Sequence, residues 1–125
     1  MSLLYVAIGG ALGASARYLV SGWMGAWFGP DFPWGTFFAN VSGSFLIGLV
    51  LVLVDGGVLP AGGRPFLAVG ILGGYTTFSS FSYESLGLLT DTGLLLTLLN
   101  TLGQLILGLV FVYFGVVVGR LIGGA

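Results

Sequence analysis

The chain has 125 residues and a mass of 12.9 kDa, the usual size of one domain, but its composition excludes a soluble globule. Hydrophobic residues make up 57% of it and charged residues only 6%, against about 25% in soluble proteins, and the mean hydropathy is +1.13. Three basic and four acidic residues cannot coat a globule of this size, so we expect the surface to face a lipid bilayer.

Two residue types are missing, and their absence limits the reactions and metal sites that the protein can support. The sequence contains no cysteine, which excludes disulfides, thiolate metal sites and cysteine nucleophiles. It contains no histidine, the commonest general base and transition-metal ligand. We therefore do not expect an enzyme. A net charge of −1 without a basic run also argues against nucleic acid as a partner.

Apolar segments of about 20 residues or more predict an all-α membrane protein in which residues 1–125 form a single four-span domain. We expect the first segment to be retained rather than removed as a signal peptide, because it has no basic start and three more spans follow. Turns rich in Gly, Pro and Asp separate the spans. The spans are expected at about residues 3–28, 34–54, 66–89 and 94–118.

The charges between the spans predict little preference for one orientation. Four spans place both termini and the second loop on one side, which gives that side Arg64 and Arg120 and the other side no basic loop residue. This small difference permits insertion both ways. Because four helices leave no room for an aqueous channel of their own, a transport role predicts an antiparallel, dual-topology homodimer.

Polar residues form stripes on two of the predicted helices. Asparagine, glutamine and hydroxyl side chains recur every four residues, which places them on one helix face. They either line a pathway or hold helices together by hydrogen bonds, and for the three amides we favour the pathway because each carries two N–H donors. The stripes are Thr36, Asn40 and Ser44 on the second span, and Asn100 and Gln104 on the fourth, where Thr97 extends the row backwards and Gly108 leaves a gap one turn further on.

The third span contains a segment that is poorly suited to a continuous helix. Gly73 and Gly74 precede two threonines and alternating Phe and Ser, so we expect a helix break at the glycines. Broken backbone at membrane depth must be buried in protein or line a cavity, and its free carbonyls can coordinate a cation. Phe78 and Phe81 share a face after the break, either as ordinary packing or as part of a pathway.

Two charged residues lie within the predicted spans. Arg17, in the middle of the first span, either reaches an interface or attracts an anion. Glu84, near the end of the third span, is a candidate to cap a polar network, pair with an arginine or bind a proton. Its place close to the interface favours a structural role.

The sequence resembles the Fluc fluoride channels, also called CrcB proteins, over nearly its whole length. The third of four matching blocks is specific, because Gly-Gly-x-Thr-Thr-Phe-Ser-x-Phe inside a membrane span is not a general pattern. The blocks are residues 9–18 (GGALGASARY), 35–45 (GTFFANVSGSF), 70–84 (GILGGYTTFSSFSYE) and 98–100 (LLN).

The resemblance implies a dual-topology homodimer with two fluoride pores and a central structural sodium ion, exporting fluoride passively from the cytoplasm across a prokaryotic plasma membrane. It places sodium on the backbone carbonyls of Gly73 and Thr76, and Arg17 in a structural or vestibule role, with which we group Glu84 because of its position. Gln104 stands where Ser or Asn is expected, and Gly108 offers no hydroxyl. The pore residues are expected to be Asn40, Thr77, Phe78, Ser80, Phe81, Asn100 and Gln104.

Elementary chemistry agrees with this assignment. Fluoride is a small, strong hydrogen-bond acceptor, so a selective pore must replace its water with close donors, which amides and hydroxyls supply. Phenyl rings carry positive edges that can contact an anion. The alternatives are a small proton-coupled four-span exporter, which needs a membrane carboxylate where the first span has Arg17, and a structural subunit without a pathway.

Overall fold

The computed structural model describes residues 2–123, which form helices joined by short loops. The third membrane segment consists of three consecutive pieces: η1 has π-helical geometry, α3 continues it directly, and α4 follows after a break. The last helix extends beyond its expected end at residue 118. The elements are α1 (Ser2–Phe28), α2 (Trp34–Asp55), η1 (Arg64–Leu72), α3 (Gly73–Tyr75), α4 (Phe78–Asp91) and α5 (Leu94–Gly123).

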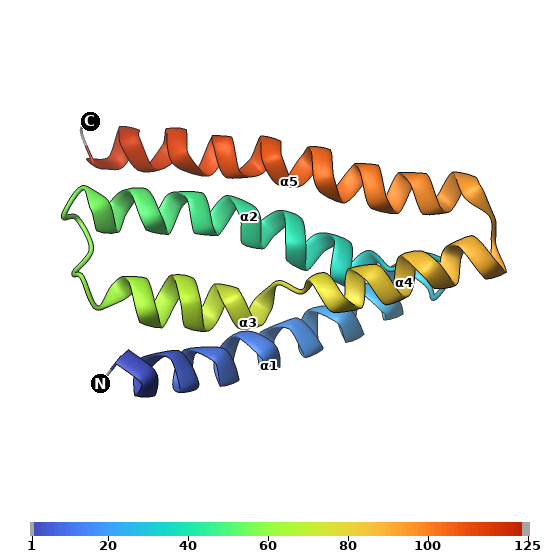
Figure 1. The fold of residues 1–125 in the computed structure, drawn as a ribbon, viewed down its shortest axis with the longest axis horizontal. Helices are drawn as coiled ribbons and strands as arrows, with labels where there is room; N and C mark the ends of the chain where they lie inside the picture. Colours follow the sequence, from blue (N-terminus) through green and yellow to red (C-terminus); the bar gives the residue numbers. More distant parts are fainter. Residues whose placement is uncertain (1, 124–125) are drawn as a thin grey trace.

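The helices lie roughly along one long axis (Figure 1). α1 packs along η1 and α3, α2 packs along α5, and α4 packs mainly against α5. The start of α1 and the end of α5 lie at the same end of the molecule. Within residues 2–123, α1, α2 and α5 are each long and apolar enough to cross a membrane, whereas the third segment is interrupted.

The break in the third segment lies at Thr76 and Thr77 and not at the glycines, so the predicted position was wrong. Gly73 is helical, with φ −63° and ψ −36°, whereas both threonines have extended backbones. β-Branched residues favour extended backbone, and the Thr77 hydroxyl caps α4 by accepting a hydrogen bond from the Ser80 amide (3.2 Å). Gly74 serves packing instead, because a Cβ there would lie 2.7 Å from the carbonyl oxygen of Gly10.

Glycines let α1 approach η1 closely, as the Gly9-x-x-x-Gly13 spacing predicts. A Cβ on Gly9 would lie 2.5 Å from the Phe66 carbonyl oxygen, and one on Gly13 would overlap the Ile71 carbonyl. Lipid supplies no hydrophobic drive for helix association, so such close packing holds the pair together through dispersion.

Glycines also allow α2 and α5 to pack closely. A Cβ on Gly115 would overlap the carbonyl of Phe45, and one on Gly119 would lie 3.0 Å from the side chain of Val52. Two closely packed helix pairs therefore form the scaffold, and α4 is joined to it across the break.

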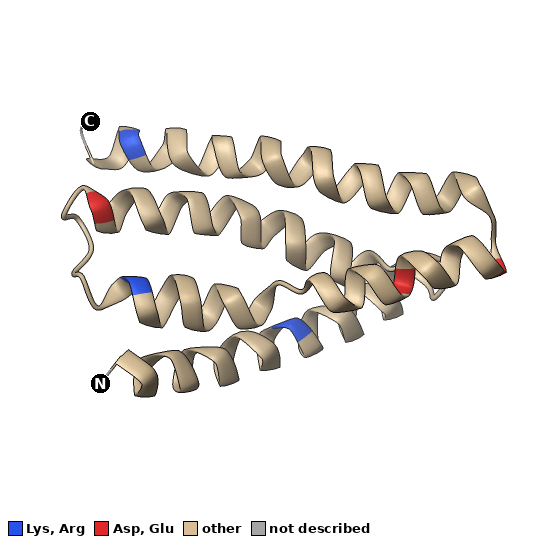
Figure 2. Cartoon of the chain, in the orientation of Figure 1, with Lys and Arg blue, Asp and Glu red and all other residues tan. Residues whose placement is uncertain are grey.

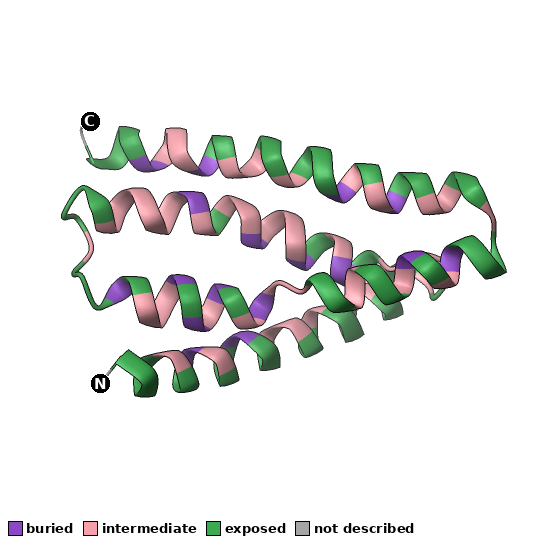
Figure 3. Cartoon of the chain, in the orientation of Figure 1, coloured by how far each residue is buried: buried purple, intermediate pink, exposed green. Residues whose placement is uncertain are grey.

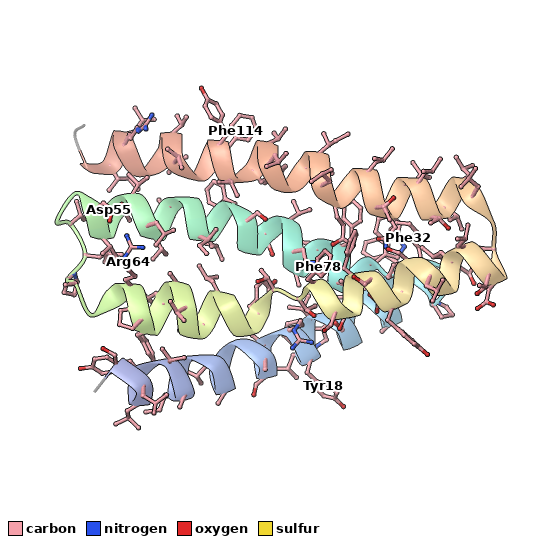
Figure 4. All side chains as sticks on the ribbon, in the orientation of Figure 1. Tyr18, Phe32, Asp55, Arg64, Phe78 and Phe114 are labelled. Carbon is pink, nitrogen blue, oxygen red and sulfur yellow. The ribbon has the colours of Figure 1, made fainter. Side chains whose placement is uncertain are left out.

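Few residues are buried (Figure 3), and many large hydrophobic side chains are exposed. Tyr18 and Phe78, for example, are 79% and 78% exposed. The charged residues lie mostly near the two ends of the molecule (Figure 2), where Arg64 contacts Asp55 at 2.7 Å across the α2–η1 loop (Figure 4). This distribution suits a bundle whose sides face lipid or another protein.

Adding one methyl group at the α1–η1 contact should test this packing. Gly13→Ala should lower stability by about 1–3 kcal/mol, because the new Cβ overlaps the backbone of Ile71. Thermal unfolding in detergent would measure the effect. The control is Gly10→Ala, where no atom lies within 4 Å of the added Cβ, and it should match or exceed the parent protein. Equal stability of the two variants would contradict the close approach of α1.

Candidate functional site

The side chain of Asn40 on α2 binds the backbone of the helix break. Its Oδ1 accepts a hydrogen bond from the Thr77 amide (2.8 Å), and its Nδ2 donates to the Thr77 carbonyl oxygen (3.1 Å). At the break the Thr77 amide has no intrahelical partner, whereas the Thr77 carbonyl, at the N-cap of α4, can still accept the first bond of that helix, and lipid offers no partner to either. Asn40 therefore satisfies the Thr77 amide, adds a bond to the Thr77 carbonyl and holds α2 against the break.

Three amide side chains continue from this point into the bundle. Asn40 Nδ2 donates to Gln104 Oε1 (2.7 Å), and Gln104 Nε2 donates to Asn100 Oδ1 (2.8 Å) on the same helix, α5. Asn100 Nδ2 then donates to Ser85 Oγ on α4 (2.9 Å). Asn100 is fully buried and Gln104 is 7% exposed. We call Asn40, Gln104, Asn100 and Ser85 the amide chain; it links α2, α5 and α4.

Two predicted phenylalanines lie beside the amide chain. The ring centroids of Phe78 and Phe81 are 5.7 Å apart, with an interplanar angle of 41°. Figure 4 shows Phe78 at the start of α4, beside α2. An open hollow of about 450 Å³ brings together the amides of α2 and α5 and the rings of α4. It is lined by Asn40, Phe78, Phe81, Thr101, Leu102, Gln104 and Leu105.

A second hollow, of about 280 Å³, lies on the other side of Asn40. Its polar walls include Ser44, Thr76 and Thr77, and it also reaches Phe78. The Ser44 hydroxyl donates to the Asn40 carbonyl oxygen (2.7 Å). Asn40 and Phe78 line both hollows and therefore lie between them.

The remaining predicted polar residues have other surroundings. The Thr77 hydroxyl caps α4 and also lies 3.3 Å from Ser79 Oγ, while Ser80 is absent from the lining of both hollows. Thr36 is buried near Glu84, and the Thr97 hydroxyl donates to the Gly93 carbonyl. These hydroxyls do not join the amide chain.

The break leaves some backbone carbonyls free. Thr76 donates to the Leu72 carbonyl with both its amide (3.0 Å) and its hydroxyl (2.9 Å). Within residues 2–123, no hydrogen bond reaches the carbonyl oxygens of Gly73 or Thr76, because the amides that would bond to them in a continuous helix have other partners. Free carbonyls of this kind can coordinate a cation.

The two charged residues of the spans lie apart from the amide chain. Arg17 Nε donates to the Gly74 carbonyl oxygen (3.2 Å), which ties α1 to the residues just before the break. Glu84 lines hollows near Asp31 and Asp91 at one end of the bundle, and its buried Oε1 has no hydrogen-bond partner among the described residues.

The sequence analysis missed two contributors. Ser85 follows Phe78 and Phe81 at helical spacing, so the face they share could have identified it. The second is the contact between the Tyr75 hydroxyl and Ser42 Oγ (3.0 Å), which joins α3 to α2. Periodicity within one helix gives no sign of such a contact between two helices.

Removing the Asn40 side chain should destabilise the fold. Asn40→Ala leaves the amide of Thr77 and Oε1 of Gln104 without their partners, at about 1–3 kcal/mol for each buried group. The matched control is Ser44→Ala, one turn away, because its hydroxyl bonds only to its own helix and its loss should change stability by at most about 0.5 kcal/mol. Thermal unfolding in detergent compares the two, and equal losses would contradict the assignment.

Comparison with known proteins identifies relatives over almost the whole chain. The family model described as "CrcB-like protein, Camphor Resistance (CrcB)" matches residues 4–116. A protein of Magnetococcus marinus is 46% identical over 123 residues, which cover 98% of this chain and 100% of the relative. A protein of Thermus thermophilus is 51% identical over 112 residues, covering 90% of this chain and 88% of the relative.

A third relative, from Geotalea uraniireducens, is 42% identical over 120 residues, covering 95% of this chain and 97% of its own. All three relatives carry the name "Fluoride-specific ion channel FluC". Matches of this extent, together with three helices apolar enough to cross a membrane, agree with the resemblance found in the sequence. The chain therefore belongs to the CrcB family and is a multi-pass membrane protein.

Proposed function

We propose that the chain forms a fluoride-selective channel, which exports fluoride passively from the cytoplasm through two pores in an antiparallel homodimer. The observation that carries the proposal is the hollow in which Asn40 and Gln104 meet Phe78 and Phe81. The names of the relatives, all fluoride-specific channels, indicate that the ion is fluoride.

The chemistry of this hollow suits fluoride. A dehydrated fluoride ion needs short contacts with hydrogen-bond donors, and the amide chain offers neutral N–H groups at membrane depth. The phenyl rings add positive edges and narrow the space. No charged side chain lines the hollow, so an ion is not held too tightly to leave.

The open side of the hollow supports a dimer. The hollow beside Phe78 is open at the side, and an ion path through lipid needs cover there. A second copy of the same chain in the opposite orientation would cover the open side of the hollow. Both orientations are permitted, because the loops on the two sides of the membrane differ little in their number of basic residues.

Sodium is the proposed structural ion. The free carbonyl oxygens of Gly73 and Thr76 suit a hard cation, which prefers oxygen ligands. Two carbonyls from each protomer would hold the ion between the subunits, where its charge balances the carbonyl dipoles at both breaks.

A proton-coupled exporter is not favoured. The relatives are named as fluoride channels, and α1 contains Arg17 and no acidic residue. Glu84 takes no part in the amide chain.

Fluoride efflux from liposomes tests the proposal. Vesicles loaded with potassium fluoride and given valinomycin should release fluoride without a pH gradient, measured with a fluoride electrode. Efflux that requires a proton gradient would favour the exporter. No fluoride efflux at all would contradict a channel and leave the structural-subunit hypothesis.

The same assay tests the sodium ion. Protein purified and assayed without sodium should lose fluoride efflux, and adding sodium should restore it. Thr76→Val, which keeps the backbone carbonyl, should have a smaller effect than sodium removal. Full efflux in the complete absence of sodium would reject a required ion at this position.

The role of the phenylalanines gives a separate prediction. Phe78→Ile or Phe81→Ile should slow fluoride efflux by about tenfold, which corresponds to about 1.4 kcal/mol for the lost contact between a ring edge and the ion. Phe114→Ile is the control, because this α5 ring is exposed and points away from the bundle (Figure 4). If all three variants conduct at the parent rate, the two rings do not line the pore.

A further inference from the structure

We propose that Gln104 determines the selectivity of the pore by competing with the permeating ion: its Oε1 occupies the hydrogen-bonding position beside Asn40 that a fluoride ion must take. This inference rests on the proposed fluoride channel. It gives Gln104 a role beyond that of a hydrogen-bond donor. The permeating anion must displace the carboxamide oxygen of Gln104, and only a strong hydrogen-bond acceptor can do so.

The backbone of Thr77 fixes the direction of the whole amide chain. Its amide can only donate and its carbonyl can only accept, so Oδ1 of Asn40 must face the former and Nδ2 the latter. The group next to Asn40 Nδ2 must then be an acceptor, Gln104 Oε1. By the same logic Gln104 Nε2 faces Asn100 Oδ1, and Asn100 Nδ2 faces Ser85.

This direction leaves Asn40 with no free donor. One of its two N–H groups bonds to the Thr77 carbonyl and the other to Gln104 Oε1 at 2.7 Å. Releasing the first would turn the whole carboxamide and take Oδ1 away from the Thr77 amide, which has no other partner, and this is costly in lipid. Releasing the second requires a rotation of the Gln104 carboxamide, which also moves Nε2 away from Asn100 Oδ1. An anion that binds to Asn40 must therefore replace the oxygen of Gln104.

Displaced from Asn40, Gln104 can still assist the ion. The three amides carry six N–H groups, of which Asn40 uses both and Gln104 and Asn100 use one each. One N–H of Gln104 therefore remains free for the ion when the side chain turns. The hollow of about 450 Å³ beside Gln104 gives the side chain room for this movement.

The exchange favours fluoride over chloride. It gives up the two hydrogen bonds of the Gln104 carboxamide to neutral groups and forms hydrogen bonds to an anion from Asn40 and Gln104, which are roughly twice as strong when the ion fits closely. Chloride is larger and a weaker acceptor, so it gains less from the same N–H groups. The Gln104 oxygen thus imposes a cost that fluoride offsets and chloride does not.

Shortening the side chain tests the inference. Gln104→Ser keeps a hydroxyl but cannot reach Asn40, so chloride efflux should rise and the ratio of fluoride to chloride efflux should fall by about tenfold, the value of one hydrogen bond. Thr97→Val is the matched control: it lies on the same helix outside both hollows, and its hydroxyl bonds only to the Gly93 carbonyl. Its efflux ratio should equal that of the parent protein.

The outcomes separate this inference from the proposed function. If the parent protein conducts fluoride and Gln104→Ser keeps the parent ratio, or only loses fluoride efflux, Gln104 is not a competitor and this inference alone fails. If the parent protein conducts no fluoride, both fail together.

A measurement on the unaltered protein avoids dependence on a variant that folds poorly. In ¹⁵N-labelled protein, sodium fluoride should shift the side-chain amide resonances of Asn40 and Gln104, while sodium chloride at equal concentration should leave them unchanged. An unchanged Gln104 resonance at fluoride concentrations that saturate efflux would overturn the inference.

Discussion

The bond between the side chain of Asn40 and the backbone of Thr77 is the interaction on which the rest of this site depends. The third membrane segment is interrupted, and its freed amide and carbonyl groups lie where no water is available to them. A carboxamide offers an acceptor and donors in a single plane, so Asn40 replaces the helical bond that the Thr77 amide lacks and also donates to the Thr77 carbonyl. Without that replacement, α4 would have no fixed direction after the break, and its two phenyl rings would have no fixed place beside α2 and α5.

Folding in lipid and ion conduction make opposite demands on the amide chain. Folding requires that each buried polar group has a partner, whereas conduction requires that donors are available to an ion. Hydrogen bonds between Gln104 and its neighbours meet the first demand and can be exchanged for bonds to an anion to meet the second. The scaffold remains fixed during such an exchange, because glycines pack α1 on η1 and α2 on α5 at backbone contact. Any movement is therefore confined to side chains and to α4.

Composition and periodicity predicted the features that belong to single helices. The long apolar segments indicated the helices, and the four-residue spacing of Asn100 and Gln104 indicated neighbours that are indeed hydrogen bonded. The break was assigned to Gly73 and Gly74 from their low helix propensity, but glycine in a membrane helix also serves close packing, and Gly74 has that role against α1. The threonines that follow break the helix because their extended backbone is stabilised from outside, by Asn40. That long-range contact, like the one between Tyr75 and Ser42, depends on how helices are placed relative to each other, which the pattern along one helix does not contain.

The break also separates two kinds of chemistry within a few residues. On one side, the carbonyl oxygens of Gly73 and Thr76 are free and could bind a cation, while Arg17 satisfies the carbonyl of Gly74 between them. On the other side, the amide chain holds N–H groups that could be transferred to an anion. A continuous helix cannot present both at mid-length, because its donors and acceptors are bonded to each other. A cation held by the free carbonyls would also raise the local potential for an anion passing nearby, without placing a charged side chain in the hollow where it would trap the ion. In the proposed channel, neutral donors near such a cation would allow the anion both to bind and to leave.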